Sequence, residues 1–400
     1  MKRFLSVFLI FFVSFSLFSF SADDIKLFTL ENGLRVYFLE DSSSPTVRLE
    51  LCVNAGFTQQ TQETGGLFTM YARLSGGEIS NDSVRFVSKV APAAAEKAVI
   101  ALAEKLKPLS VSDVSLSSII KAMNTEFSEY ASSATGFINS AIDSKLFPEN
   151  PWSRESGVIP SSFASRKTEE FRTALSAISD RYYIPANAIL FINGNLTESA
   201  ALSLVKKYFS PLPARPFQNP PSSEEESSAS LLKNKKIGTE RKFVLYHKDF
   251  SDELTQIVLQ YTSLSRDEAD ALASSWNQDG SAFKKLLLKQ RNLKILGDEY
   301  IDASSAQEKN ASRLIVQSLI GKAKVSPVVQ ANLFLTMSRD EDVFSKKELE
   351  AALKKSRTSF TRLSESSDAT MEQFALSVSR ELFSPDVIER FFTKNDKGYQ

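Results

Sequence analysis

A segment poor in apolar residues divides this 400-residue chain into two parts. Five prolines stand between Pro211 and Pro221, and residues 222–228, which follow them, read SSEEESS. Such a composition cannot bury enough apolar surface to offset the entropy that is lost on folding, so it predicts a linker. We therefore expect four segments, and their residue ranges are 1–21 for a leader, 22–213 for a first domain, 214–237 for the linker and 238–400 for a second domain.

The leader has the pattern of a secretory signal peptide. Two basic residues precede an apolar run over 4–20 that only serines interrupt. Ser19 and Ser21 supply the small side chains that cleavage before Ala22 requires, which predicts a periplasmic or otherwise exported chain with no membrane span left after cleavage. An uncleaved membrane anchor is the alternative, because the run approaches the ~20 residues that a bilayer needs.

Charge and cysteine content exclude nucleic-acid binding and an intramolecular disulfide. The chain has 48 basic and 48 acidic residues and no basic stripe, so it has no field that would attract nucleic acid. The only cysteine, Cys52, excludes an intramolecular disulfide. In the predicted strand over 47–53, Cys52 lies on the opposite face from the valines and leucines, and we interpret it as a small apolar filler rather than a reactive thiol.

Local patterns predict strands and helices in both parts of the chain. The Asn32-Gly33 turn enters an alternating strand, Thr197 is placed to cap a helix, and Ser345 with Glu348 forms a capping box. The strands that we expect lie at 34–39, 47–54, 189–192, 242–246 and 256–261, and the helices at 93–107, 115–130, 267–293 and 346–363. Strands interleaved with helices and hairpin turns predict an α+β fold rather than a doubly wound sheet.

Several of these segments resemble the insulinase (pitrilysin) metallopeptidase family, which includes the mitochondrial processing peptidases and non-catalytic homologues. The first strand matches the pattern L-x-N-G-L-x-V, the second ends in Ala-Gly, and a later segment matches Y-x-P-x-N, a glycine and a helix that ends in Y-F-x-x-L-P. The matching residues are Leu30, Asn32, Gly33, Leu34, Val36, Ala55, Gly56, Tyr183, Pro185, Asn187, Gly194, Tyr208, Phe209, Leu212 and Pro213. The resemblance implies two insulinase-like modules, each an antiparallel sheet with helices packed on one face.

The zinc motif of that family, H-x-x-E-H on a helix, has no counterpart here, because the chain contains a single histidine. In one register Thr69, Ala72 and Arg73 occupy the motif positions, and in a register shifted by one residue Phe68, Tyr71 and Ala72 do. Neither register supplies a zinc ligand or a base to activate water. We therefore predict a degenerate motif, with no metal or other cofactor and no catalytic residue.

Two further family sites have partial counterparts. Glu126 matches the third zinc ligand by context, but a lone carboxylate does not hold zinc against water, so we interpret it as an exposed or salt-bridged remnant. The family also has an arginine and a tyrosine in its second domain that hold substrate. Here Lys289, Arg291 and Tyr300 lie near the corresponding positions without matching them, and they are candidates for peptide binding, with a solvated basic face as the alternative.

No other catalytic signature is present in the sequence. His247 lies two residues before Asp249, but a His/Asp pair needs an activated nucleophile, and there is no G-x-S-x-G elbow and no phosphate-binding glycine loop.

The resemblance therefore implies an exported, catalytically inactive peptidase-like subunit. Such a subunit pairs with an active zinc-bearing homologue in a heterodimer and helps to form a chamber that binds peptide or unfolded protein segments. One alternative is a stand-alone envelope protein-binding or assembly factor that uses the same scaffold without proteolysis. Another is an enzyme that borrows zinc ligands from its partner at a shared site.

Overall fold

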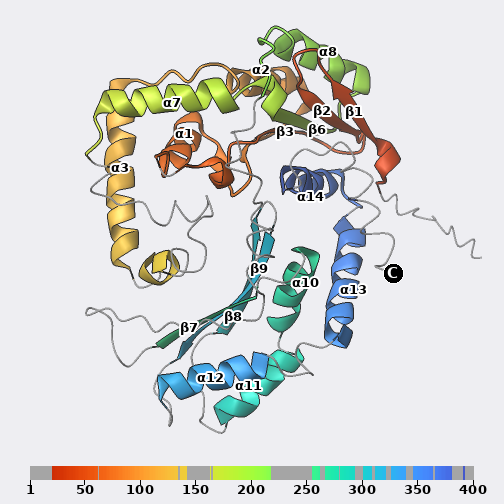
Figure 1. Ribbon diagram of the computed structural model, residues 1–400. Coiled ribbons are helices and arrows are strands. Elements are labelled where there is room, and N and C mark those ends of the chain that lie inside the picture. The colour runs from red at the N-terminus through yellow and green to blue at the C-terminus, as the bar shows by residue number, and fades with distance from the viewer. Residues whose placement is uncertain are drawn as a thin grey trace, which may run out of the picture.

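The computed structural model of the chain describes two groups of residues, which we call the N-terminal half (20–217) and the C-terminal half (255–391) (Figure 1). The described residues are 20–61, 63–133, 136–141, 163, 165–217, 255–261, 266–278, 280–292, 301–308, 311–320, 326–338, 346–363, 365–380 and 391. Most of the predicted leader, the linker beyond Phe217, the strand expected at 242–246 and His247 lie outside them. No helix among the described residues is long and apolar enough to cross a bilayer.

The N-terminal half is built on a six-stranded sheet in the order β1-β2-β6-β3-β5-β4. Its strands are β1 (Ile25–Thr29), β2 (Arg35–Glu40), β3 (Val47–Val53), β4 (Glu78–Ile79), β5 (Val84–Val90) and β6 (Ala188–Gly194). The β2–β6 pair is parallel, and the other pairs are antiparallel. The sheet is therefore mixed, and the prediction of an antiparallel sheet is wrong here, because β6 returns through a long helical crossover that permits parallel pairing.

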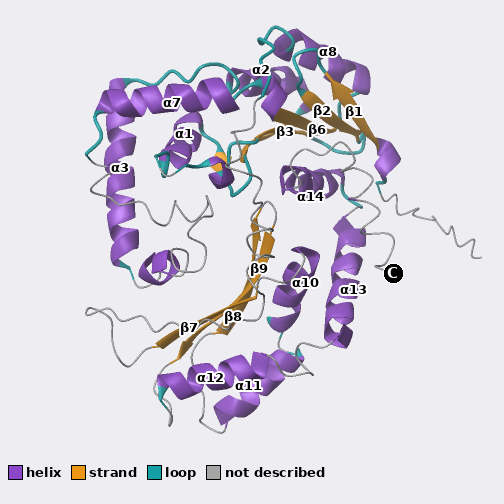
Figure 2. Cartoon of the chain, in the orientation of Figure 1, coloured by secondary structure: helices purple, strands orange, loops and turns teal. Residues whose placement is uncertain are grey.

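Five helices form the main apolar core together with one face of this sheet, although not all of them lie on the sheet itself (Figure 2). They are α1 (Leu67–Ser75), α2 (Ala95–Glu104), α3 (Asp113–Ser132), α7 (Thr168–Tyr182) and α8 (Glu198–Phe209). Short 3-10 turns lie at η1 (Ala22–Asp24), η2 (Phe57–Gln59), η3 (Pro92–Ala94) and η4 (Pro185–Asn187). Because side chains alternate along a strand, Leu49 and Leu51 of β3 face these helices while Cys52 points to the other side.

The C-terminal half has a three-stranded antiparallel sheet in the order β7-β9-β8. Its elements are β7 (Thr255–Tyr261), α10 (Arg266–Trp276), α11 (Ala282–Asn292), β8 (Ile301–Glu308), β9 (Ala311–Ile320), α12 (Pro327–Ser338) and α13 (Lys346–Leu363). The helix expected over 267–293 is broken in two, because the Ser281 hydroxyl donates to the Trp276 carbonyl at 3.0 Å and accepts from the Lys284 amide at 3.1 Å, which starts a new helix.

The last described helix, α14 (Ser367–Arg380), packs on the six-stranded sheet of the N-terminal half, on the face opposite the five helices (Figure 1). Its Phe374 ring meets Tyr37 edge-on at 5.0 Å and Phe191 at 5.9 Å between ring centroids. The expectation of helices on one face only is therefore wrong for this sheet. A sheet that is apolar on both faces needs a cover on each, and the second cover is supplied by α14.

Candidate functional site

Helix α1 carries the positions that the sequence marks as a degenerate zinc motif. It lies between Gly66 and Gly76, both in the left-handed region with φ of 79° and 75°, so two tight turns bound it. Residues 67–72 are all buried, and Arg73 is the first exposed position of the helix. Among the motif positions on α1, only Arg73 is therefore exposed to solvent.

The two registers proposed for the motif have different surroundings. In the shifted register, Phe68 packs edge-on against Tyr182 of α7 at 5.2 Å between ring centroids. Tyr71 donates its hydroxyl to Ser179 of α7 at 3.1 Å, and burial raises its pKa to about 12. These side chains belong to the core and cannot face a cleft.

The unshifted register ends at Arg73, which forms a two-pronged ion pair with Glu126 of α3. Its Nη1 donates to Oε2 at 2.5 Å and its Nη2 donates to Oε1 at 2.8 Å. Hydrogen bonding to the Arg73 guanidinium, together with its charge, lowers the pKa of Glu126 against the opposing effect of partial burial. Glu126 is therefore a salt-bridged carboxylate. The other two motif positions of this register, Thr69 and Ala72, are buried on α1.

The chemistry of this corner does not suit zinc. A catalytic zinc site needs three histidine, cysteine or carboxylate ligands, whereas α1 and α3 bring together one carboxylate, one guanidinium, one hydroxyl and one methyl group. The guanidinium also already takes both oxygens of the carboxylate. Across the described residues, no group of three or more His, Cys, Asp or Glu side chains could hold a metal ion.

The residues proposed to clamp a peptide lie elsewhere. Lys289 is exposed on α11, Arg291 lies in the last turn of the same helix, and Tyr300 is outside the described residues. Figure 1 places α11 at the opposite end of the molecule from α1, whose Arg73 holds Glu126. The structure therefore does not bring Lys289 together with Glu126.

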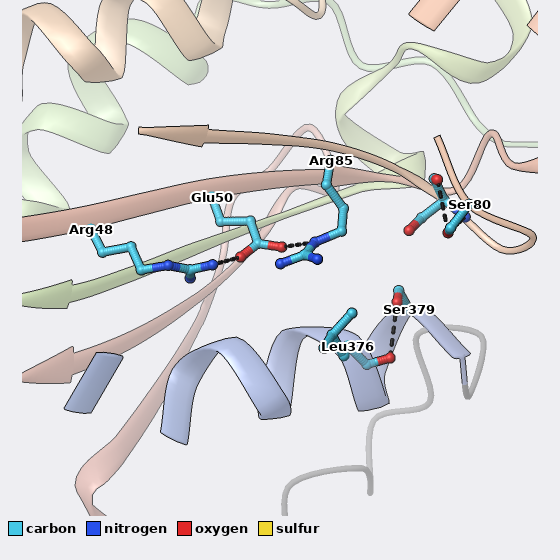
Figure 3. A network of polar contacts seen from close by, with 7 residues as sticks. Arg48, Glu50, Ser80, Arg85, Leu376 and Ser379 are labelled. Carbon is cyan, nitrogen blue, oxygen red and sulfur yellow. Dashed lines mark hydrogen bonds and ion pairs between the residues drawn. The ribbon is translucent and has the colours of Figure 1, made fainter. Parts of the chain in front are cut away.

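A second polar cluster, which sequence analysis missed, is buried between the sheet and α14 (Figure 3). Glu50 of β3 is fully buried and forms ion pairs with Arg48 on its own strand and Arg85 on β5. The alternation of Arg48 and Glu50 with Leu49 and Leu51 was visible in the sequence. That pattern predicts a solvent-facing side of a strand, whereas α14 of the C-terminal half packs on this face of β3.

Comparison with known proteins identifies the fold. Residues 171–275 match the family model described as the peptidase M16 inactive domain. No curated protein matches the sequence significantly. A protease from Helicobacter pylori has a similar structure, with a TM-score of 0.72 and 15% sequence identity over 92% of this chain and 93% of that one.

Two other solved structures are also similar to this chain. A chain of complex III2 from Candida albicans has a TM-score of 0.64 and 12% identity over 93% of this chain and 90% of that one. The periplasmic protease PqqL from Escherichia coli has a TM-score of 0.61 and 14% identity over 94% of this chain and 45% of its own. This chain therefore spans about one module of that fold, and the prediction of two modules is wrong in number although its α+β class is confirmed.

Proposed function

We propose that the chain, whose residues 171–275 match the peptidase M16 inactive domain, is an exported, catalytically inactive subunit that pairs with an active zinc-bearing homologue. In that pair it helps to form a chamber for peptide or unfolded protein segments. The proposal treats Thr69, Ala72 and Arg73 as the degenerate positions of H-x-x-E-H and Glu126 as the remaining third ligand.

The ion pair between Arg73 and Glu126 is the observation that carries this proposal. A metallopeptidase needs a divalent cation that polarises the substrate carbonyl and lowers the pKa of a bound water. Here a guanidinium supplies the positive charge next to Glu126, but it offers no open coordination position and activates no water. The fold is thus retained, and the Arg73 guanidinium provides a positive charge next to Glu126. The residues that hydrolysis requires are replaced.

The similar structures are consistent with pairing. This chain covers 45% of PqqL and 88% of the first half of PqqL, so it corresponds to about half of that protein. The similar chain from Candida albicans comes from a multi-subunit complex, which is consistent with a fold that works in assemblies.

Native purification of a tagged chain from its own host tests the proposal. We expect a second M16 chain with an intact H-x-x-E-H motif in equal amount, with zinc and peptidase activity in the complex and neither in this chain alone. Stoichiometric zinc or peptidase activity in the isolated chain would refute it. Recovery with an unrelated envelope protein instead would favour the stand-alone binding factor. The same sample tests export, because a mature chain is expected to begin at Ala22.

A further inference from the structure

Helix α14 belongs to the C-terminal half by sequence, yet its packing partners are β3 and β6 of the N-terminal half. One side of the helix is apolar and covers the apolar part of the sheet. The apolar cluster contains Met371, Phe374, Ala375 and Val378 of α14 with Ile25, Tyr37, Leu39, Cys52, Ile189, Phe191 and Phe391. The C-terminal half therefore completes the fold of the first sheet.

The first turn of α14 contacts charged and polar groups of the sheet. Asp368 forms an ion pair with Lys89 of β5 and accepts a hydrogen bond from the Asn193 side chain at 2.7 Å. Ser367 donates its hydroxyl to Asp41 at 2.6 Å. These contacts sit at the first turn of α14, where a negative side chain also interacts favourably with the helix dipole.

We propose that α14 is a releasable strap that closes the six-stranded sheet and holds the two halves together, with a hold that weakens as ionic strength rises. The Lys89 and Asp368 side chains are 55% and 27% exposed, so dissolved salt screens their attraction. A 14-residue helix is marginal on its own in water and needs its dock to stay folded. Only residues 364–366 separate α14 from α13, so the strap leaves the sheet as a unit with that end of the C-terminal half.

The chain has a built-in reporter of this motion. Cys52, its only cysteine, is 1% exposed and lies in the apolar cluster that α14 covers. Burial raises the pKa of its thiol to about 12, and the nearby Glu50 charge adds to this effect. With α14 in place, Cys52 is closed to thiol reagents. When α14 lifts, Cys52 becomes accessible and more acidic.

The test is the rate of Cys52 labelling in the full-length mature chain across a range of NaCl concentrations. Lys89→Glu places a negative charge against Asp368, and Asp368→Lys places a positive charge against Lys89, so each variant should raise the labelling rate roughly tenfold at low salt. The double exchange Lys89→Glu with Asp368→Lys restores an ion pair, and the Asn193 side-chain oxygen, which has no partner among the described residues, is placed to accept from the new lysine. Its rate should return toward wild type.

Lys207→Glu is the matched control, because it makes the same charge change in another exposed ion pair, with Glu96 on the helical side of the sheet. Its labelling rate should equal that of wild type. Hydrogen exchange distinguishes release from general unfolding, since amides of α14 should exchange faster in the single variants while those of α8 do not. Unchanged labelling in both single variants, no recovery in the double exchange, or equal acceleration in Lys207→Glu would each overturn the proposal.

Discussion

At the scale of single residues, Arg73 has an environment that local sequence patterns do not specify. The lack of zinc ligands follows from residue types alone, because one histidine cannot make the motif. The register could not be chosen from sequence, because neither set of positions contains a zinc ligand that would fix it. The partner of Arg73 lies 53 residues away on α3, and that contact depends on how two helices pack.

The ion pair predicts a pH-dependent contribution to stability. The pKa of Glu126 is lowered in the folded chain, so the pair stabilises the fold above the ordinary glutamate range of about 4.3 and this contribution is lost as pH falls through the lowered pKa. Both partners are partly exposed, so Arg73→Ala should cost about 0.2–1 kcal/mol at neutral pH and nearly nothing in acid. Urea unfolding at both pH values measures the difference. An equal loss of stability at both pH values would show that Arg73 stabilises the fold through the packing of its aliphatic side-chain carbons.

Restoring two histidines tests the register. Thr69→His with Arg73→His places imidazoles one turn apart beside Glu126, and this pair should bind one zinc ion per chain in metal analysis after dialysis. Adding Glu126→Gln should abolish the binding. The comparison pair Phe68→His with Ala72→His puts both side chains in the core against α7 and should bind none. Zinc in the second pair and not in the first would reverse the assignment.

At the scale of elements, periodicity located some of the local structures but not their pairing. The helix predicted over 346–363 is α13 (Lys346–Leu363), Thr197 caps α8 by accepting from the Ala200 amide, and the strand at 189–192 is β6. The parallel pairing of β6 with β2 and the docking of α14 were not predicted. Both join segments more than 140 residues apart in sequence, and short-range patterns contain no information on such contacts.

Gly194, which ends β6, is predicted to be irreplaceable. Its φ is +113°, and a Cβ there would lie 2.1 Å from the carbonyl oxygen of Thr46, so Gly194→Ala should combine backbone strain with a clash. We expect a loss of about 1–3 kcal/mol in the free energy of unfolding. Gly280→Ala is the control, because a Cβ at Gly280 meets no atom within 4 Å. Similar unfolding midpoints for the two variants would contradict this account.

At the scale of the whole molecule, the described structure joins its halves in two ways. The chain passes once from the N-terminal half to the C-terminal half through residues 218–254 and then returns to the first sheet with α14. The sequence predicts a linker at 214–237 from its prolines, serines and glutamates, and most of that segment lies outside the described residues. The return was not predicted, because the apolar stripe of α14 gives no indication of which sheet it covers.

A cut between the halves should therefore leave them associated. A protease site inserted within residues 222–228 should give two fragments that co-elute as one particle in gel filtration at low salt. In the wild-type chain the cut fragments should separate as salt is raised, because salt screens the attraction between Lys89 and Asp368. In the Lys89→Glu background they should already separate at low salt, where the repulsion from Asp368 is not screened. Immediate separation of the cut wild-type chain would mean that α14 does not join the halves.

The position of α14 in the chain also bears on how the protein is made. Synthesis begins with the strands that form the first sheet, but the cover for their Tyr37 and Phe191 face arrives only when α14 has been added. Until then the nascent chain has a sheet with one exposed apolar face. Chaperones bind such surfaces, and such surfaces also promote aggregation. Products that stop before α14 should be cleared or precipitate, so the early part of the chain depends on its late part for solubility as well as for shape.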